Sequence, residues 1–232
     1  MISIIIPAYN EEGHIGGTIR RLRERAGGEH LYEILVVDGG SQDATGKEAS
    51  GAGAVALLGP QKGRAAQMNF GALKARGSIL YFLHADSIPP GGFLSDILTA
   101  VGKGFGSGCY RLRFDHAHWF LRANSWFTRF NVNAVRFGDQ SLFATADVFR
   151  RSGGFREDLI VMEDQEIIHR LKKHSRFVVM QGAVITSSRK YLDNGIYRMQ
   201  AIFFRIWFLY YRGWPQERLL KEYRRLIQKS KI

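Results

Sequence analysis

The chain has little or none of several features that would assign it to common classes of protein. Its 232 residues include one cysteine, Cys109, which excludes an internal disulfide and suits a reducing compartment. No apolar run reaches the roughly 20 uninterrupted residues that a membrane-spanning helix requires. The first residues, MISIIIPAYN, carry no basic leader, so we do not expect a signal peptide. These absences favour a globular protein of the cytoplasm.

Acidic residues are also few relative to basic ones. Lys and Arg number 33 against 21 Asp and Glu, so the formal net charge is +12 at pH 7. Such an excess favours an anionic partner, which could be nucleic acid, an acidic lipid surface or a phosphorylated substrate. No glycine-rich dinucleotide fingerprint or P-loop follows a predicted strand. The length suits one large α/β domain with an appendage.

Strand-like and helix-like patterns alternate along the first half of the chain. Strands are expected at 2–6, in YEILVVD, in AVALL and in ILYFL. Between them, helices are expected from about Asn10, from about Ser41, and in GRAAQMNFGALKARG, with Ala66, Phe70 and Leu73 as its apolar positions. This βαβαβαβ order predicts a mainly parallel sheet covered by helices on both faces.

The fourth of these strands lies in SILYFLHADSIPP, residues 78–90. Its apolar part is typical of a buried strand, and the two prolines prevent the ladder from continuing. His84 and Asp86 therefore follow the carboxyl end of the strand, where ligands collect in open α/β sheets. Asp also commonly caps turns, so this spacing alone leaves both interpretations of Asp86 open.

Two other predicted strands end in polar residues, in PAYNEE and in DGGSQD. Right-handed crossovers bring these ends to the same edge as Asp86. The expected pocket is lined by Tyr9, Glu11, Asp38, Asp43 and Asp86. Its carboxylates repel one another unless a cation or a hydrogen-bonding ligand is present. Asp86 suits Mg²⁺ or Mn²⁺ shared with phosphate oxygens, and Arg64 could approach such phosphates directly.

Five motifs, taken together and in order, resemble those of family 2 glycosyltransferases. ISIIIPAYNEE, EILVVDGGSQDAT, KGRAAQMNFGA and LHADS resemble the nucleotide-binding half of that family, and GGFREDLIVMEDQEIIHRL resembles the acceptor half. The chain is similar in particular to a small bacterial branch. The resemblance implies a GT-A fold, with a Rossmann-type, mainly parallel central sheet over residues 1–190. Within it, residues 1–90 would bind the nucleotide and 91–190 the acceptor, and 191–232 would form an amphipathic, basic helical extension.

The same resemblance implies an activity and a set of donor residues. The reaction would be an inverting, Mg²⁺- or Mn²⁺-dependent transfer of a sugar from a nucleotide diphosphate sugar to an acceptor hydroxyl. The nucleotide-binding residues carried over by motif are Pro7, Ala8, Tyr9, Glu11, Asp38, Gly63, Arg64, Ala85 and Asp86. Asp86 would hold the metal. The usual acid-x-acid signature reads His84-Ala85-Asp86 here, which leaves the choice of sugar nucleotide open.

In the second half, MEDQEIIHRLKKH predicts a helix that begins with Glu163 and Asp164. Free backbone amides at a helix start stabilise carboxylates, and ordinary capping is the competing interpretation. The resemblance makes Asp164 the base that takes the acceptor proton, with Glu163 as its neighbour.

Further site residues also come from the resemblance or from the position of basic side chains. Asp139 and Gln140 would lie beside the sugar or acceptor, and Arg189 could neutralise the leaving diphosphate. The Gln-x-x-Arg-Trp motif of processive relatives is absent, so we do not expect synthesis of long polymers. His116 and His118 are interpreted as a loop pair because no third metal ligand is near them in sequence.

Two aromatic and basic stretches remain, WFLRANSWFTRFNVNAVRF and IYRMQAIFFRIWFLYYRGW. Arginines interrupt both, so neither is expected to span a membrane. They predict interfacial helices at an anionic membrane surface, on the inner face of the cell membrane, where a lipid-linked acceptor could be met. Packing on the domain or on a second copy in a homodimer is the alternative.

Two other functions fit parts of the sequence. A nucleotidyltransferase would share the strand-end acids and the metal. A non-catalytic nucleic-acid binder would explain the charge, but it gives no reason for clustered carboxylates, so nucleic acid is not an expected partner.

Overall fold

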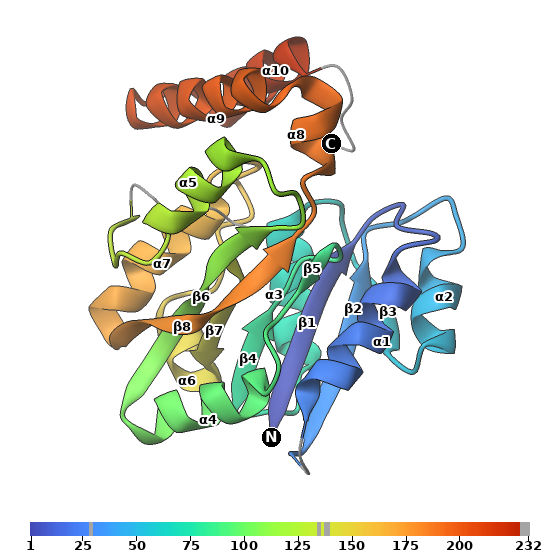
Figure 1. Ribbon diagram of the computed structural model, residues 1–232. Helices are drawn as coiled ribbons and strands as arrows, with labels where there is room; N and C mark the ends of the chain where they lie inside the picture. The colour runs from blue at the N-terminus through green and yellow to red at the C-terminus, as the bar shows by residue number, and fades with distance from the viewer. Residues whose placement is uncertain (28–29, 134–135, 137–139, 228–232) are drawn as a thin grey trace.

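The structure is a computed structural model that describes residues 1–27, 30–133, 136 and 140–227. An eight-stranded mixed sheet runs through the molecule in the order β3-β2-β1-β4-β7-β6-β8-β5 (Figure 1). The strands are β1 (Ile2–Ala8), β2 (Tyr32–Asp38), β3 (Val55–Leu58), β4 (Ile79–Phe82), β5 (Ser87–Ile88), β6 (Phe105–Phe114), β7 (Leu142–Thr145) and β8 (Arg176–Thr186). The helices are α1 (Ile15–Ala26), α2 (Thr45–Gly51), α3 (Arg64–Lys74), α4 (Phe93–Gly102), α5 (Trp119–Phe127), α6 (Ala146–Arg151), α7 (Glu163–His174), α8 (Arg189–Asn194), α9 (Ile196–Tyr211) and α10 (Gln216–Leu226).

The strands of the first half pair in parallel, as the alternating pattern predicts. β1 pairs with β2 on one side and β4 on the other, and β3 continues the parallel order beyond β2. β7 joins antiparallel to both β4 and β6. Every residue of β1 is buried because α1 and α4 pack on one face of the sheet and α3, α6 and α7 on the other (Figure 1). The predicted sheet, mainly parallel and covered by helices, is confirmed.

Helix α3 packs against the sheet through Ala65, Met68 and Gly71; of the predicted apolar positions, Ala66 is buried and Phe70 half-buried. Leu73 is 78% exposed, so its assignment to the buried face is wrong. The close approach occurs at Gly71, where an added Cβ would lie 2.5 Å from Ile5 Cγ2. A side chain at this position would push the helix away from the sheet. Gly71 therefore lets the residues one turn earlier, including Gln67, reach the ends of the central strands.

The first two helices begin later than the sequence predicts. Asn10 adopts a left-handed φ of 51° and its Oδ1 accepts a hydrogen bond from Gln42 N (3.0 Å), so it does not start a helix. Asn10 N in turn donates to Ser41 Oγ (2.9 Å). α1 starts only at Ile15 and α2 at Thr45. The polar side chains expected to cap helices instead tie the loop after β1 to the loop after β2.

The carboxyl-terminal helices lie over one end of the sheet, with α9 and α10 side by side (Figure 1). They share an apolar cluster with β6 and α5, which includes Leu112, Phe114 and Leu121. α9 contributes Met199, Ile202 and Ile206 to that cluster. Its other face exposes four aromatic side chains, Tyr197, Phe204, Phe208 and Tyr211. Within the described ranges, no helix is long and apolar enough to cross a membrane.

Candidate active site

The ends of β1 and β2 are held together by the amide of Gln67, from the first half of α3. Gln67 Nε2 donates to Ala8 O (2.8 Å) and to Val37 O (2.7 Å), and Gly39 N also donates to Ala8 O (2.9 Å). The Gln67 side chain is buried, so these bonds are shielded from water. Gln67 was not among the predicted site residues; its one signal in the sequence is a polar amide between the apolar Ala66 and Met68. It fixes the strand ends that precede Tyr9 and Gly39.

Asp38 closes the turn after β2. Its Oδ1 accepts hydrogen bonds from Gly40 N (3.1 Å), Ser41 N (2.8 Å) and Ser41 Oγ (2.6 Å). In the part of the chain that the structure describes, Asp38 Oδ2 has no hydrogen bond. The turn therefore orients the carboxylate and leaves one oxygen for a ligand.

Tyr9 and Glu11 lie on the loop after β1, next to this turn. Lys62 Nζ lies 5.4 Å from the centre of the Tyr9 ring, and Glu11 N donates to Thr45 Oγ1 (2.8 Å). Pro7 is buried within β1, opposite Val37. Asp43 stabilises the loop after β2, because its Oδ1 accepts a hydrogen bond from the Thr45 hydroxyl. The same hydrogen bond lowers the pKa of the Asp43 carboxyl group.

His84, Ala85 and Asp86 form a tight turn between β4 and β5. Ser87 N donates to His84 O (3.1 Å), and Thr18 Oγ1 of α1 donates to Ala85 O (2.7 Å). Ser87 Oγ then reaches Thr186 Oγ1 (3.1 Å) at the end of β8. Three elements thus fix the turn that carries Asp86, at the edge where β1 and β2 also end.

Glu163 and Asp164 begin α7, directly after Met162, which has a left-handed φ of 72°. Arg64, the first residue of α3, joins them: its Nη2 lies 2.5 Å from Glu163 Oε1 and 3.8 Å from Asp164 Oδ2. The Glu163 side chain is 1% exposed and that of Asp164 is 19% exposed. Arg64 was expected to flank the nucleotide, and the structure places it against the acid pair. Asp164 is the more exposed member of the pair.

Burial raises the pKa of Glu163 to about 7. The positive charge of Arg64 opposes this shift, the negative charge of Asp164 adds to it, and His84 opposes it more weakly. His84, in the turn after β4, is thus one of the charges that act on Glu163. The structure therefore brings together residues from the two halves of the sequence: Arg64 and His84 from the first, Glu163 and Asp164 from the second.

The remaining predicted residues lie in different surroundings. Gly63 precedes α3 with a φ of 123°, and no atom lies within 4 Å of an added Cβ, so the space in front of this helix start is open. Arg189 Nη1 lies 3.0 Å from His14 Nε2 at the start of α1. Gln140 is buried and donates to Tyr110 O (3.0 Å), which makes it part of the packed interior. Asp139 lies outside the described residues.

The carboxylates at this edge suit a shared metal better than a cage of protein ligands. Among the described residues, no group of three or more His, Cys, Asp and Glu side chains could hold a metal ion. Mg²⁺ and Mn²⁺ commonly bind through one or two carboxylates while phosphate oxygens and water complete the shell. A single carboxylate on a fixed turn, as at Asp86, fits that pattern.

His116 and His118, predicted to be a loop pair, lie just before α5, where His118 caps the start of the helix. His118 Nδ1 accepts a hydrogen bond from Phe120 N at the start of α5 (3.3 Å), and His118 N donates to His116 Nδ1 (3.2 Å). Cys109 is buried, and burial raises the pKa of its thiol to about 11, so it is not a reactive thiolate.

Comparisons with known proteins give a consistent family and fold. The family model "Glycosyl transferase family 2" matches residues 3–157. Glycosyltransferase AglE of Haloferax volcanii is 36% identical over 95 residues, which cover 38% of this chain and 31% of that protein. Glucosyl-3-phosphoglycerate synthase of Mycolicibacterium smegmatis is 29% identical over 123 residues, 47% of this chain and 40% of the relative. The chain thus spans well under half the length of these curated relatives.

A solved structure extends the likeness to most of the chain. Mannosyltransferase PcManGT from Pyrobaculum calidifontis, in complex with GDP-Man and Mn²⁺, superposes with a TM-score of 0.71 at 16% identity. The match covers 88% of this chain and 61% of that protein. At 16% identity, this similarity shows that the two proteins share a fold.

Replacing Glu163 with Gln should change how stability depends on pH. Because the folded-state pKa is raised from 4.5 to about 7, the folded chain retains a proton that the unfolded chain loses between these values. Ionisation of Glu163 therefore lowers the free energy of unfolding as pH rises through this window, by on the order of 3 kcal/mol. Glu163→Gln should resemble the wild type near pH ~4 and gain stability relative to it near pH ~8. Calorimetric melting of both proteins measures this, and a difference that does not vary with pH would contradict it.

Proposed function

Because the chain belongs to glycosyl transferase family 2, we propose that it transfers a sugar from a nucleotide diphosphate sugar to an acceptor hydroxyl, with inversion and with Mg²⁺ or Mn²⁺ as cofactor. Family membership confirms the resemblance seen in the sequence, and the fold likeness confirms a GT-A-like domain. The observation that carries the proposal is the contact of Arg64 with Glu163 and Asp164. Through it, an acid pair from the second half lies at the edge where the donor residues of the first half converge.

The donor nucleotide would lie over the ends of β1 and β2. Pro7, Ala8, Tyr9 and Glu11 would line the base and ribose, and Asp38 Oδ2 would accept a hydrogen bond from the base. This assignment is supported by the way Gln67 and the turn at Asp38 hold the strand ends in place.

The diphosphate would lie between Asp86, Gly63 and Arg189. Asp86 would hold the metal, which when bound offsets the charge of the diphosphate. The open space before α3 at Gly63 leaves room for a phosphate, and the guanidinium of Arg189 supplies a further positive charge. The mannosyltransferase of similar fold is described with GDP-Man and Mn²⁺, which supports this donor class.

Asp164 would accept the proton from the acceptor hydroxyl. The hydroxyl oxygen forms a bond to the anomeric carbon as the bond from that carbon to the diphosphate breaks, and the electron pair leaves with the diphosphate. A single displacement of this kind inverts the anomeric centre. Asp164 is suited to accept this proton because its side chain is partly exposed. Glu163 is buried against Arg64 and would position the Arg64 side chain.

Removing the Asp86 carboxylate should abolish the metal-dependent part of nucleotide binding. In the HADS turn, His84 stands where the family has a second acid, so the turn offers no substitute ligand. We expect Asp86→Ala to bind uridine or guanosine diphosphate equally with and without Mn²⁺, whereas the wild type binds more tightly with the metal. Calorimetric titration measures both, and a preserved effect of Mn²⁺ in the variant would place the metal elsewhere.

Asp164→Asn should keep nucleotide affinity and lose turnover. The amide preserves the shape of the side chain but cannot take a proton, so we expect a loss on the order of a hundredfold or more. Release of nucleoside diphosphate from a panel of nucleotide sugars and acceptors measures the rate. If the wild type releases pyrophosphate instead, the protein is a nucleotidyltransferase. If Asp164→Asn transfers sugar at a near-normal rate, another residue is the general base.

We further propose that α9 lies against an anionic membrane surface. Its exposed aromatic side chains form an apolar face on the opposite side from the buried cluster, and Arg212 lies over the Phe208 ring, 4.8 Å from its centre. Arg205 is one of the arginines that interrupt this stretch, and its Nε donates to Glu222 Oε1 of α10 (2.7 Å). Reversing the charge of Arg205 would therefore disturb the α9–α10 contact, so a clean test uses the aromatic residues.

Phe204→Ser combined with Phe208→Ser should reduce binding to vesicles that contain anionic lipid. The two rings are 60% and 50% exposed, so their loss removes membrane contact without opening the core. Leu73→Ser, which removes an exposed apolar side chain from α3, is the matched control. Vesicle flotation measures the binding. If the wild type does not float and instead forms a dimer that the double variant disrupts, the aromatic face is a subunit interface.

A further inference from the structure

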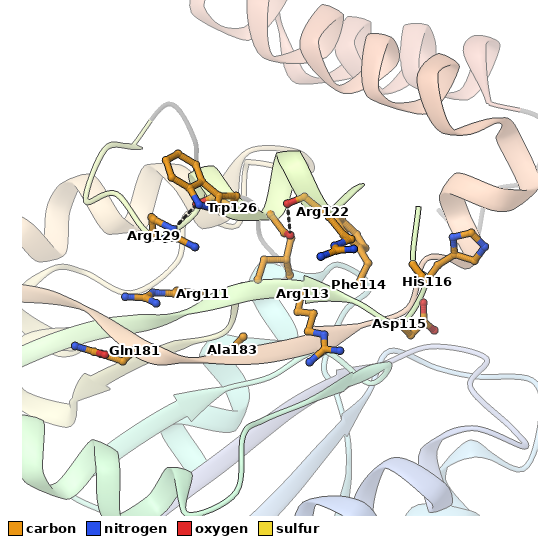
Figure 2. A pocket seen from close by; sticks show the side chains of 13 residues that line it. Arg111, Arg113, Phe114, Asp115, His116, Arg122, Trp126, Arg129, Gln181 and Ala183 are labelled. Carbon is orange, nitrogen blue, oxygen red and sulfur yellow. Dashed lines mark hydrogen bonds between the residues drawn. The ribbon is translucent and has the colours of Figure 1, made fainter. Parts of the chain in front are cut away.

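A cavity of about 610 Å³ lies between the β6–β8 strand pair and α5 (Figure 2). Its volume is within the range of small-molecule binding sites. None of the residues assigned above to the donor, the metal or the acid pair lines it. The cavity is therefore a second candidate site, and the proposed reaction does not account for it.

The lining of the cavity is strongly basic. Arg111 and Arg113 come from β6, where residues two apart share a face, and Arg122 and Arg129 come from α5 on the opposite wall and from the turn that follows it (Figure 2). Asp115 is the one carboxylate among the described lining residues, and its Oδ1 already accepts a hydrogen bond from Ser188 N (2.8 Å). Four arginines thus line the cavity, and little negative charge there balances them.

Most of these guanidinium groups lack partners within the part of the chain that the structure describes. Arg111 Nε is buried and has no hydrogen bond there, and the side chains of Arg113 and Arg122 form neither a hydrogen bond nor an ion pair. A buried cationic donor without a partner is costly, so Arg111 Nε is expected to meet a ligand or water, whereas Arg113 and Arg122 are exposed to solvent. Arg129 differs, because its Nε donates to Trp126 O (3.0 Å) and its guanidinium lies over the Trp126 ring.

We propose that this cavity binds the phosphate group of a phosphorylated ligand. Arginines from two elements, β6 and α5, supply several donors for the acceptor oxygens of a phosphate, with which arginine forms paired hydrogen bonds. The Trp126 ring, which also lines the cavity, offers an apolar surface to the rest of the ligand.

The cavity lies close to the proposed metal-binding turn. Asp115 N donates to Thr186 O (3.1 Å), and the Thr186 hydroxyl accepts from Ser87, the residue after Asp86. A ligand in this cavity would therefore lie next to the proposed donor site. It would not be the donor itself, whose diphosphate is proposed to bind at Asp86.

Calorimetric titration with glycerol phosphate, in the presence of a chelator and without nucleotide, tests the proposal. We expect the wild type to bind, and Arg111→Gln combined with Arg113→Gln to weaken binding about tenfold or more, because each charged hydrogen bond contributes substantially. Arg21→Gln combined with Arg224→Gln removes the same charge from two exposed positions outside the cavity, and it should bind as the wild type does. Equal affinity in all three proteins, or no binding to any of them, would overturn the proposal.

Two further measurements distinguish a lost phosphate contact from a disturbed strand and from a damaged donor site. Arg122→Gln changes only α5, so a loss of binding there cannot result from a disturbed strand β6. Nucleoside diphosphate binding with Mn²⁺ should persist in all these variants, and glycerol phosphate binding should persist in Asp86→Ala. Failure of the phosphate site is thereby distinguished from failure of the proposed glycosyl transfer.

The source of the phosphate is identified with vesicles of phosphatidylcholine and phosphatidic acid, which present the same glycerol phosphate group on a lipid. If the Arg111 and Arg113 substitutions reduce vesicle binding more than the control substitutions do, the cavity takes a lipid headgroup. If they reduce binding of glycerol phosphate but leave vesicle binding unchanged, the ligand is a water-soluble phosphate. Either result supports a phosphate site.

Discussion

The ion pair between Arg64 and Glu163 is the interaction on which the arrangement of the site depends. Burial at 1% exposure raises the pKa of Glu163 to about 7, and the nearby cation limits that rise, so the contact offsets part of the cost of burying the carboxylate. Here the cation begins α3 and the carboxylate begins α7. One short contact therefore fixes two helix starts that come from opposite halves of the sequence. Asp164 takes its place from this contact, because it is the next residue along the helix.

The position of Arg64 depends in turn on how closely α3 approaches the sheet. Gly71 allows the helix to contact Ile5, and Gln67, one turn nearer the helix start, then reaches the carbonyl groups of Ala8 and Val37. The same helix thus ties the ends of β1 and β2 and presents Arg64 to the acid pair. The close approach of α3 to β1 at Gly71 therefore determines both the packing of this helix on the sheet and the positions of Gln67 and Arg64 in the site.

Local patterns in the sequence were sufficient for the first four strands, β1 to β4, and for the polar residues that follow them. Asp86 could be placed at the edge of the sheet because an apolar run, a polar pair and two prolines follow one another within a single segment. The partners of Gln67 and Arg64 could not be predicted, because they depend on strand register and on a helix far along the chain. The exposure of Leu73 was missed for a related reason: the small residues on the other side of α3 permit a closer contact, which no apolar periodicity reveals.

The net charge of +12 pointed to an anionic partner, and the contacts of individual arginines show where such a partner could bind. Arg76, Arg170 and Arg205 each form an ion pair with a glutamate, so their charge is largely neutralised within the chain. Arg111 and Arg113 are not neutralised in this way, and they face the cavity beside α5. Nucleic-acid recognition usually employs a basic stripe along an open surface, where phosphates of an extended backbone can be followed. Arginines that line one cavity favour a compact anion instead, which is the kind of ligand proposed for the cavity beside α5.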